Sequence, residues 1–159
     1  MLHVRLIVLG NLKEAYWRDA VAEYEKRLAA YAKVEITELK EYRLPENPSP
    51  AEIAAALERE AEAVLAAILP RSFVVALCVE GKQLSSEELA QKLAAVMQQS
   101  GSLTLIIGSS HGLSDRVKQA ASLRLSVSKL TFPHQMMRVL LLETVYRSLS
   151  ILNGSKYHK

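Results

Sequence analysis

The fold is decided by two short runs, Phe73-Val74-Val75-Ala76-Leu77-Cys78-Val79 and Leu103-Thr104-Leu105-Ile106-Ile107. Each is almost continuously apolar and too short for a buried helix. Such runs are typical of strands that are covered on both faces in a parallel sheet. We therefore expect residues 73–79 and 103–108 to form central strands.

Alternating segments on both sides of these runs complete the pattern. Further strands are expected at 2–9, 33–39 and about 123–127, and 33–39 should be an edge strand because its apolar residues stand among charged ones. Helices are expected at about 13–32, 49–69, 85–100, just after Ser114, and 134–152, with capping boxes at Ser49 and Ser85. The order βαβαβαβαβα predicts an α/β fold, a three-layer sandwich with a mainly parallel sheet. Trp17 and the tyrosines of the first helix are expected in the hydrophobic core of this fold.

Length and composition limit the class of protein. The 159 residues are 50% hydrophobic and 23% charged, which suits a single domain over 1–159 and excludes a disordered chain or a two-domain enzyme. The single Cys78 can form no internal disulfide and suits a reducing cytoplasm. The apolar start carries Arg5 and no cleavage site, and no run reaches the roughly 18 apolar residues that span a bilayer. We expect neither export nor membrane insertion.

The charge is distributed unevenly. Residues 1–109 hold twelve Lys and Arg against fifteen Asp and Glu, a net charge of −3, whereas residues 110–159 hold eight against two, a net charge of +6. A cationic third favours a polyanionic partner such as RNA. A solvated basic face is the alternative.

Ligands of parallel sheets bind beyond the carboxyl ends of the strands, which here means the loops after residues 79, 108 and 127. The loop 108–114 is rich in Gly and Ser, and glycine lets the backbone approach a ligand closely, although a plain turn would look the same. No dinucleotide, P-loop, zinc-binding or serine-hydrolase motif is present, so no metal is expected. The proline-bearing segment 40–49 is interpreted as a mobile connection, and the very apolar last helix as buried or paired with a second subunit.

Several longer runs match a known family. The matches lie mostly in the last third of the chain, with shorter ones near its start: Ile107-Gly108-Ser109-Ser110-His111-Gly112-Leu113, Leu130-Thr131-Phe132-Pro133-His134-Gln135-Met136-Met137-Arg138-Val139, Tyr146-Arg147, Tyr157-His158-Lys159, Val8-Leu9-Gly10, Tyr16-Trp17 and Glu23-Tyr24-Glu25-Lys26-Arg27-Leu28. With them the chain closely resembles, over essentially its whole length, the ribosomal RNA large subunit methyltransferase H family of the SPOUT methyltransferases.

The resemblance implies a fold, a reaction and a cofactor site. The fold is an α/β sandwich with a C-terminal trefoil knot, and the protein is a cytoplasmic homodimer. The reaction transfers a methyl group from S-adenosylmethionine to N3 of a pseudouridine in the 23S rRNA of the ribosome. The implied cofactor-binding residues are Leu77, Gly108, Val127, Ser128, Lys129, Leu130, Thr131 and Phe132. Ser109 stands where the family usually has a second glycine, which would cost on the order of 1 kcal/mol if that position needed a positive φ.

The chemistry also needs a group that takes the N3 proton. His158 is the candidate base, with Tyr157 orienting or stacking on the target base and Arg138 or Lys129 stabilising negative charge. A frayed terminus is the alternative for the tail. Two other functions stay open: an RNA-binding or nucleotide-sensing protein without chemistry, and a small hydrolase using Ser109-Ser110-His111.

Overall fold

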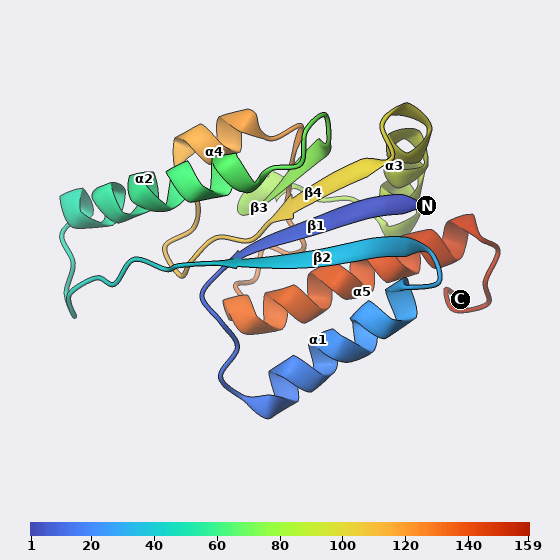
Figure 1. Cartoon of the computed structure of the whole chain (residues 1–159), viewed down its shortest axis with the longest axis horizontal. Coiled ribbons are helices and arrows are strands. Elements are labelled where there is room, and N and C mark those ends of the chain that lie inside the picture. Colours follow the sequence, from blue (N-terminus) through green and yellow to red (C-terminus); the bar gives the residue numbers. More distant parts are fainter.

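The structure is a computed structural model that describes residues 1–159, and its centre is one sheet of five parallel strands (Figure 1). The strands lie in the order β2-β1-β4-β3-β5. Their bounds are Leu2–Leu9 for β1, Ala32–Leu39 for β2, Phe73–Lys82 for β3, Ser102–Ile106 for β4 and Leu123–Leu125 for β5. The helices are α1 (Ala15–Leu28), α2 (Pro50–Ala67), α3 (Ser86–Gln99), α4 (Asp115–Ala120) and α5 (His134–Leu152).

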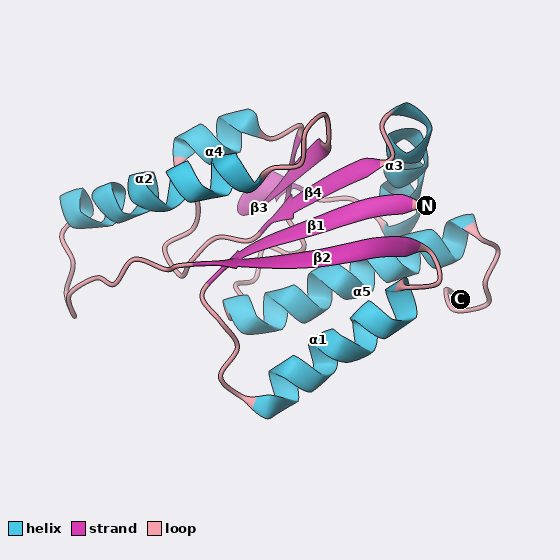
Figure 2. Cartoon of the chain, in the orientation of Figure 1, coloured by secondary structure: helices cyan, strands magenta, loops and turns pink.

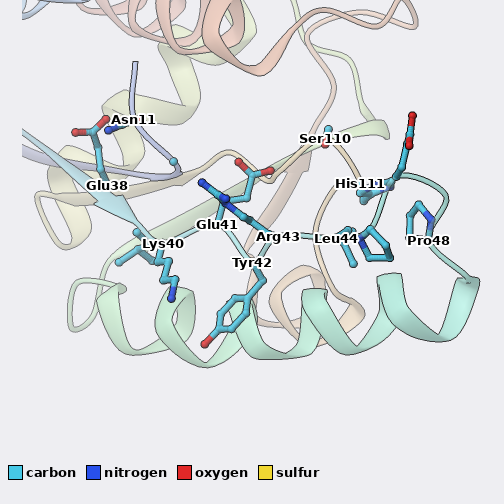
Figure 3. A pocket seen from close by; sticks show the side chains of 14 residues that line it. Asn11, Glu38, Lys40, Glu41, Tyr42, Arg43, Leu44, Pro48, Ser110 and His111 are labelled. Atoms are coloured by element: carbon cyan, nitrogen blue, oxygen red, sulfur yellow. The ribbon is translucent and has the colours of Figure 1, made fainter. Parts of the chain in front are cut away.

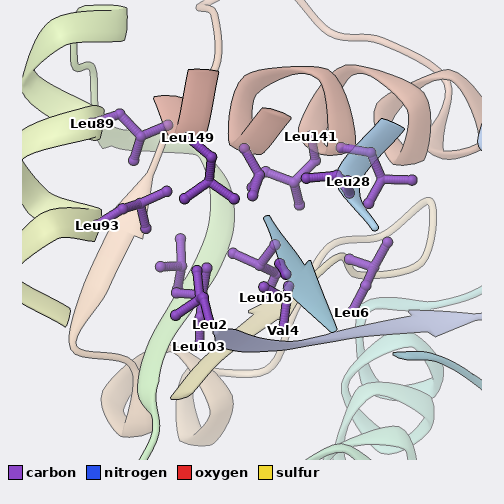
Figure 4. Close-up of a cluster of buried hydrophobic side chains, with 14 of the residues drawn as sticks. Leu2, Val4, Leu6, Leu28, Leu89, Leu93, Leu103, Leu105, Leu141 and Leu149 are labelled. Carbon is purple, nitrogen blue, oxygen red and sulfur yellow. The ribbon is translucent and has the colours of Figure 1, made fainter. Parts of the chain in front are cut away.

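Helices cover both faces of the sheet, so the expected three-layer sandwich is confirmed (Figure 2). On one face α1, α3 and α5 bury a leucine-rich cluster that includes Leu28, Leu93 and Leu141 (Figure 4). On the other face α2 and α4 bury a smaller cluster around Ile7 and Ile106. The sheet is therefore largely apolar on both sides, which is why β3 and β4 are almost continuously apolar runs.

The predicted strand positions are confirmed in outline. β3 and β4 are interior strands, with β1 between β4 and β2, and β2 is an edge strand. The capping boxes are also confirmed, because the hydroxyls of Ser49 and Ser85 accept from the Glu52 and Glu88 amides, 3.1 Å each, and the glutamates bond back.

Several element ends differ from the prediction. α1 covers 15–28 and not 13–32, because the chain turns at Tyr31, whose amide donates to the Leu28 carbonyl at 2.8 Å, and enters β2. Tyr16 is 64% exposed, so its predicted core position is wrong.

The loop predicted after residue 79 also differs. β3 continues to Lys82 after an irregularity in its pairing with β5. Gly81 makes this possible, because a Cβ there would lie 2.8 Å from the backbone of Arg124 and Leu125.

The remaining expectations concern membrane-spanning helices, metal-binding groups and the knot. No helix of the structure is long and apolar enough to cross a membrane, and no group of three or more His, Cys, Asp or Glu side chains could hold a metal ion. The trefoil knot stays a prediction.

Candidate active site

A cavity of about 760 Å³ lies at the carboxyl ends of β3, β4 and β5. Seven of the eight predicted cofactor residues line it: Leu77, Gly108, Val127, Ser128, Leu130, Thr131 and Phe132. The eighth, Lys129, lies on the same loop but is exposed and outside the lining. We call this space the loop cavity, and its full lining is residues 77–80, 107–113, 118, 126–128, 130–135 and 137.

The turn after β4 is closed so tightly that its first glycine is required. The Gly112 amide donates to the Ser109 carbonyl at 2.9 Å, and Gly112 has a φ of +86°. A Cβ on Gly108 would lie 2.6 Å from the Gly112 carbonyl carbon. A valine at Gly108 would therefore displace the turn itself, whatever occupies the cavity. Ser109 does not have a positive φ, so the strain considered for it does not arise.

The loop after β5 is shaped by its own serines. The Ser126 hydroxyl donates to the Ser128 carbonyl at 2.9 Å, and the Leu130 amide donates to the Ser128 hydroxyl at 3.0 Å. These bonds bend the segment so that Leu130, 71% exposed, projects at the mouth of the cavity. The loop's own hydroxyls thus hold its backbone in this shape.

Both apolar and charged groups line the loop cavity. Leu77, Leu130 and Phe132 provide apolar surface. Lys118 and Glu80 form an ion pair of 2.7 Å, and this bond lowers the pKa of the Glu80 carboxyl and raises the pKa of the Lys118 ammonium. The lining therefore suits a ligand with an aromatic part and a zwitterionic part.

A second cavity, of about 850 Å³, lies at the carboxyl ends of β1 and β2 (Figure 3). We call it the polar cavity, and its lining is residues 10–11, 38–46, 48 and 110–111. It shares Ser110 and His111 with the loop cavity. Sequence reasoning missed it because residues 40–49 were interpreted as a mobile connection. The rule about carboxyl ends, applied to the strands 2–9 and 33–39, would have found it.

Arg138, a predicted catalytic residue, lies outside both linings and is 2% exposed. Its guanidinium donates to Glu38 Oε2 at 3.0 Å, to the Gly10 carbonyl at 3.0 Å and to the Leu9 carbonyl at 3.3 Å. The side chain thus joins α5 to the ends of β1 and β2. The structure does not bring it to the loop cavity.

Tyr157 is packed against its own chain and is not a frayed end. Its ring lies 4.8 Å from the Tyr146 ring, the Arg147 guanidinium lies 4.7 Å from its centre, and its hydroxyl donates to Glu143 Oε2 at 3.2 Å. Burial is the main reason that the pKa of Tyr157 is raised to about 12. The phenol is neutral at physiological pH.

His158 lies beside Tyr157, between α3 and α5. Its Nε2 is 2.8 Å from Glu87 Oε1 and its Nδ1 is 3.3 Å from Arg147 Nη1. The bond to His158 is the main cause of the lowered pKa of Glu87. Neither tail residue lines the loop cavity of its own chain, so the three predicted catalytic residues are not brought together within one chain.

Comparisons with known proteins show the family and the fold of the chain. A family model described as "Predicted SPOUT methyltransferase" matches residues 2–158, and the chain belongs to the SPOUT methyltransferase family. The chain is similar to a probable methylase family protein from Haemophilus influenzae Rd KW20 (14% identity, 98% of this chain and 70% of that chain, TM-score 0.56). It is also similar to a tRNA (m1G37) methyltransferase from Aquifex aeolicus (17% identity, 98% and 73%, TM-score 0.53). At these identities the two structures share the fold.

The methyl donor of this family is S-adenosylmethionine, so the expected cofactor is confirmed. The loop cavity fits it chemically. Its apolar surface at Leu77, Leu130 and Phe132 suits the adenine ring, and the Lys118–Glu80 pair suits the carboxylate and ammonium of the methionine part. The turn between Gly108 and Gly112 brings backbone groups to the same wall.

Proposed function

We propose that this SPOUT methyltransferase methylates N3 of a pseudouridine in the 23S rRNA of the large ribosomal subunit, in the cytoplasm. One observation carries the proposal. The loops that match the ribosomal RNA methyltransferase H family are the loops that build the cavity, and seven of the eight implied residues line it. Family membership supports an enzyme over a protein that only binds RNA or a small hydrolase.

The residues of the loop cavity hold the cofactor. Leu77 and Phe132 cover the adenine ring, and Lys118 binds the carboxylate while Glu80 binds the ammonium. The backbone of the turn at Gly108 adds hydrogen bonds that need no side chain. The bound cofactor supplies an electrophilic methyl group.

Removal of the N3 proton is assigned to His158, with Tyr157 orienting the base. Tyr157 contacts Glu143 of α5, His158 lies between α3 and α5, and neither lines the loop cavity of its own chain. We therefore propose a homodimer in which the tail of one protomer serves the loop cavity of its partner. The half-buried Met136 and Leu140 on α5 add apolar surface that a second protomer would cover.

Only some of the eight Lys and Arg side chains in residues 110–159 are free of a carboxylate partner and so available to bind RNA phosphates. Arg116, Lys118, Arg138 and Arg147 are each paired with a carboxylate. The cations without such a partner in residues 110–159 are Arg124, Lys129, Lys156 and Lys159. These four are the proposed contacts to phosphate.

The test is methyl transfer from radiolabelled S-adenosylmethionine to ribosomes that lack the modification, followed by nucleoside analysis of the 23S rRNA. We expect label on N3 of pseudouridine. His158→Ala should lower the single-turnover rate by about 100-fold or more, the usual scale for a general base. The control Lys92→Gln changes an exposed cation on α3 and should retain the wild-type rate. Label on tRNA alone, or on another atom of the 23S rRNA, would refute the proposed substrate.

A further inference from the structure

We infer that the polar cavity receives the target nucleotide of the RNA, with the edge of its base turned toward Ser110 and His111. The inference rests on the proposed function, since it presumes that the acceptor is a nucleotide and that the loop cavity holds the methyl donor. It assigns a ligand to the loop between β2 and α2.

Adjacency is the first argument. A methyl group passes directly between two molecules only when donor and acceptor atoms are held in contact, so the acceptor site must adjoin the cofactor site. The polar cavity meets this condition, because Ser110 and His111 belong to both linings. At about 850 Å³ it lies in the size range of small-molecule sites.

The side chains of the polar cavity match a pyrimidine nucleotide. Arg138 pairs with Glu38, and the other charged groups of the lining are Glu41, Glu46, Lys40 and Arg43. The two exposed cations, Lys40 and Arg43, are the proposed contacts to a phosphate. Asn11 and Glu41 offer an amide and a carboxylate, which pair with the carbonyl and imino N–H groups of a base (Figure 3). The Glu41 carboxylate faces the end of β1, where a Cβ on Gly10 would lie 3.2 Å from its Oε2.

The wall that carries these groups is anchored from below. The Tyr42 amide donates to Glu60 Oε2 at 3.1 Å, and Glu60 is 4% exposed. The Tyr42 ring points toward α2 and lies between Lys40 Nζ, at 5.8 Å, and Arg59 Cζ, at 5.7 Å (Figure 3). Binding thus meets a wall that is already in place, which lowers the entropy lost on binding.

Glu60 also lies near the shared wall. Burial raises the pKa of its carboxyl, while Ser109 and His111 are among the groups that act in the opposite direction. Its Oε1 is buried without a hydrogen-bond partner. The hydrogen bond that Glu60 accepts from the Tyr42 amide holds the loop between β2 and α2 in place.

Binding is tested on the full-length protein first loaded with S-adenosylhomocysteine, which blocks the loop cavity. Pseudouridine 5′-monophosphate is then titrated in and amide resonances are followed by NMR. We expect S-adenosylhomocysteine to shift resonances of Leu77 and Leu130, the nucleotide to shift those of residues 40–43, and both ligands to shift those of Ser110 and His111. If the nucleotide leaves residues 40–43 unmoved, or only displaces S-adenosylhomocysteine, the inference is overturned.

The paired variant Lys40→Gln, Arg43→Gln tests the site during turnover. Loss of two phosphate contacts should raise KM for undermethylated ribosomes by about tenfold with kcat within about threefold. S-adenosylhomocysteine affinity should stay at the wild-type value, and Lys92→Gln should leave KM unchanged. An unchanged KM in the paired variant overturns the inference while the proposed function stands. A wild-type protein that binds no S-adenosylhomocysteine and transfers no methyl group refutes the proposed function itself.

Discussion

The Arg138 guanidinium is a structural joint between α5 and the carboxyl ends of β1 and β2. Arg138→Met would leave the buried carbonyl of Leu9 and the half-buried carbonyl of Gly10 without this donor. Unpaired buried polar groups cost about 1–3 kcal/mol, so we expect a loss of that size in the free energy of unfolding, measured with urea.

Glu38→Gln is the matched control for Arg138. Glu38 is 45% exposed, and its replacement leaves both carbonyl bonds of Arg138 intact, so the loss should be smaller. An Arg138→Met protein as stable as the wild type but without methyl transfer would instead support the catalytic role expected from the sequence.

Glu35 makes stability depend on pH in the acid range. Its hydrogen bond from Arg5 is the main cause that lowers its pKa from 4.5 to about 2, and His3 adds to the effect. A carboxyl with a lowered folded-state pKa stabilises the fold above its unfolded pKa, and the contribution disappears as pH falls through the folded value. The difference in unfolding free energy between wild type and Glu35→Gln should therefore be widest above pH 4.5 and close toward pH 2.

Urea unfolding of both proteins between about pH 2 and 6 measures that difference. Glu46→Gln, an exposed carboxylate outside any ion pair, is the control and should show no such convergence. A difference that stays constant over this range would show that the ion pair to Arg5 does not cause it.

At the scale of elements, periodicity and capping predicted each helix and strand but not where several of them end. The capping boxes at Ser49 and Ser85 fix two helix starts because the signal is local. The end of β3 at Lys82 depends on Gly81 meeting the backbone of a strand more than 40 residues away in the chain. No local pattern contains that contact.

The C-terminal tail is an element whose stability and function can be separated. Removal of residues 157–159 should abolish methyl transfer, and it should also lower the free energy of unfolding by about 1–2 kcal/mol, because the contact with Tyr146 and the bond to Glu143 are lost. His158→Ala removes the bond to the exposed Glu87 and the contact with Arg147 Nη1 but keeps the packing of Tyr157, so it should lower the free energy of unfolding by less than the truncation does. Thermal unfolding and single-turnover rates measure the two effects. Wild-type rates from the shortened chain would mean that the tail takes no part in the reaction.

At the scale of the whole molecule, the sheet order β2-β1-β4-β3-β5 and the two cavities arise from pairing between distant segments. The parallel-sheet rule located the loop cavity because it needs only the carboxyl ends of strands. It could not show that Arg138 binds the ends of β1 and β2 and so lies outside the loop cavity. The ion pair between Arg138 and Glu38, for example, joins residues 100 positions apart in the chain.

The charge asymmetry of the chain makes a prediction about RNA binding as a function of salt. Each cation that contacts a phosphate releases a counterion, so replacing it makes the slope of log affinity against log salt shallower by about one. Lys129 is exposed without a carboxylate partner, whereas Arg116 is held by Glu58 at 3.1 Å and Glu62 at 2.8 Å. Lys129→Gln should therefore make the slope for ribosome binding shallower, and Arg116→Gln, with the same change of net charge, should not.

Filter binding at several salt concentrations measures both slopes. The comparison separates specific contacts from the overall field, because the two variants carry the same net charge, while the lost cation is unpaired on the loop after β5 in one and paired on α4 in the other. Equal slopes in both variants would mean that the basic third acts through its summed charge. A wild-type slope in the Lys129 variant would mean that Lys129 contacts no phosphate, as expected if the basic residues of the last third form a solvated face.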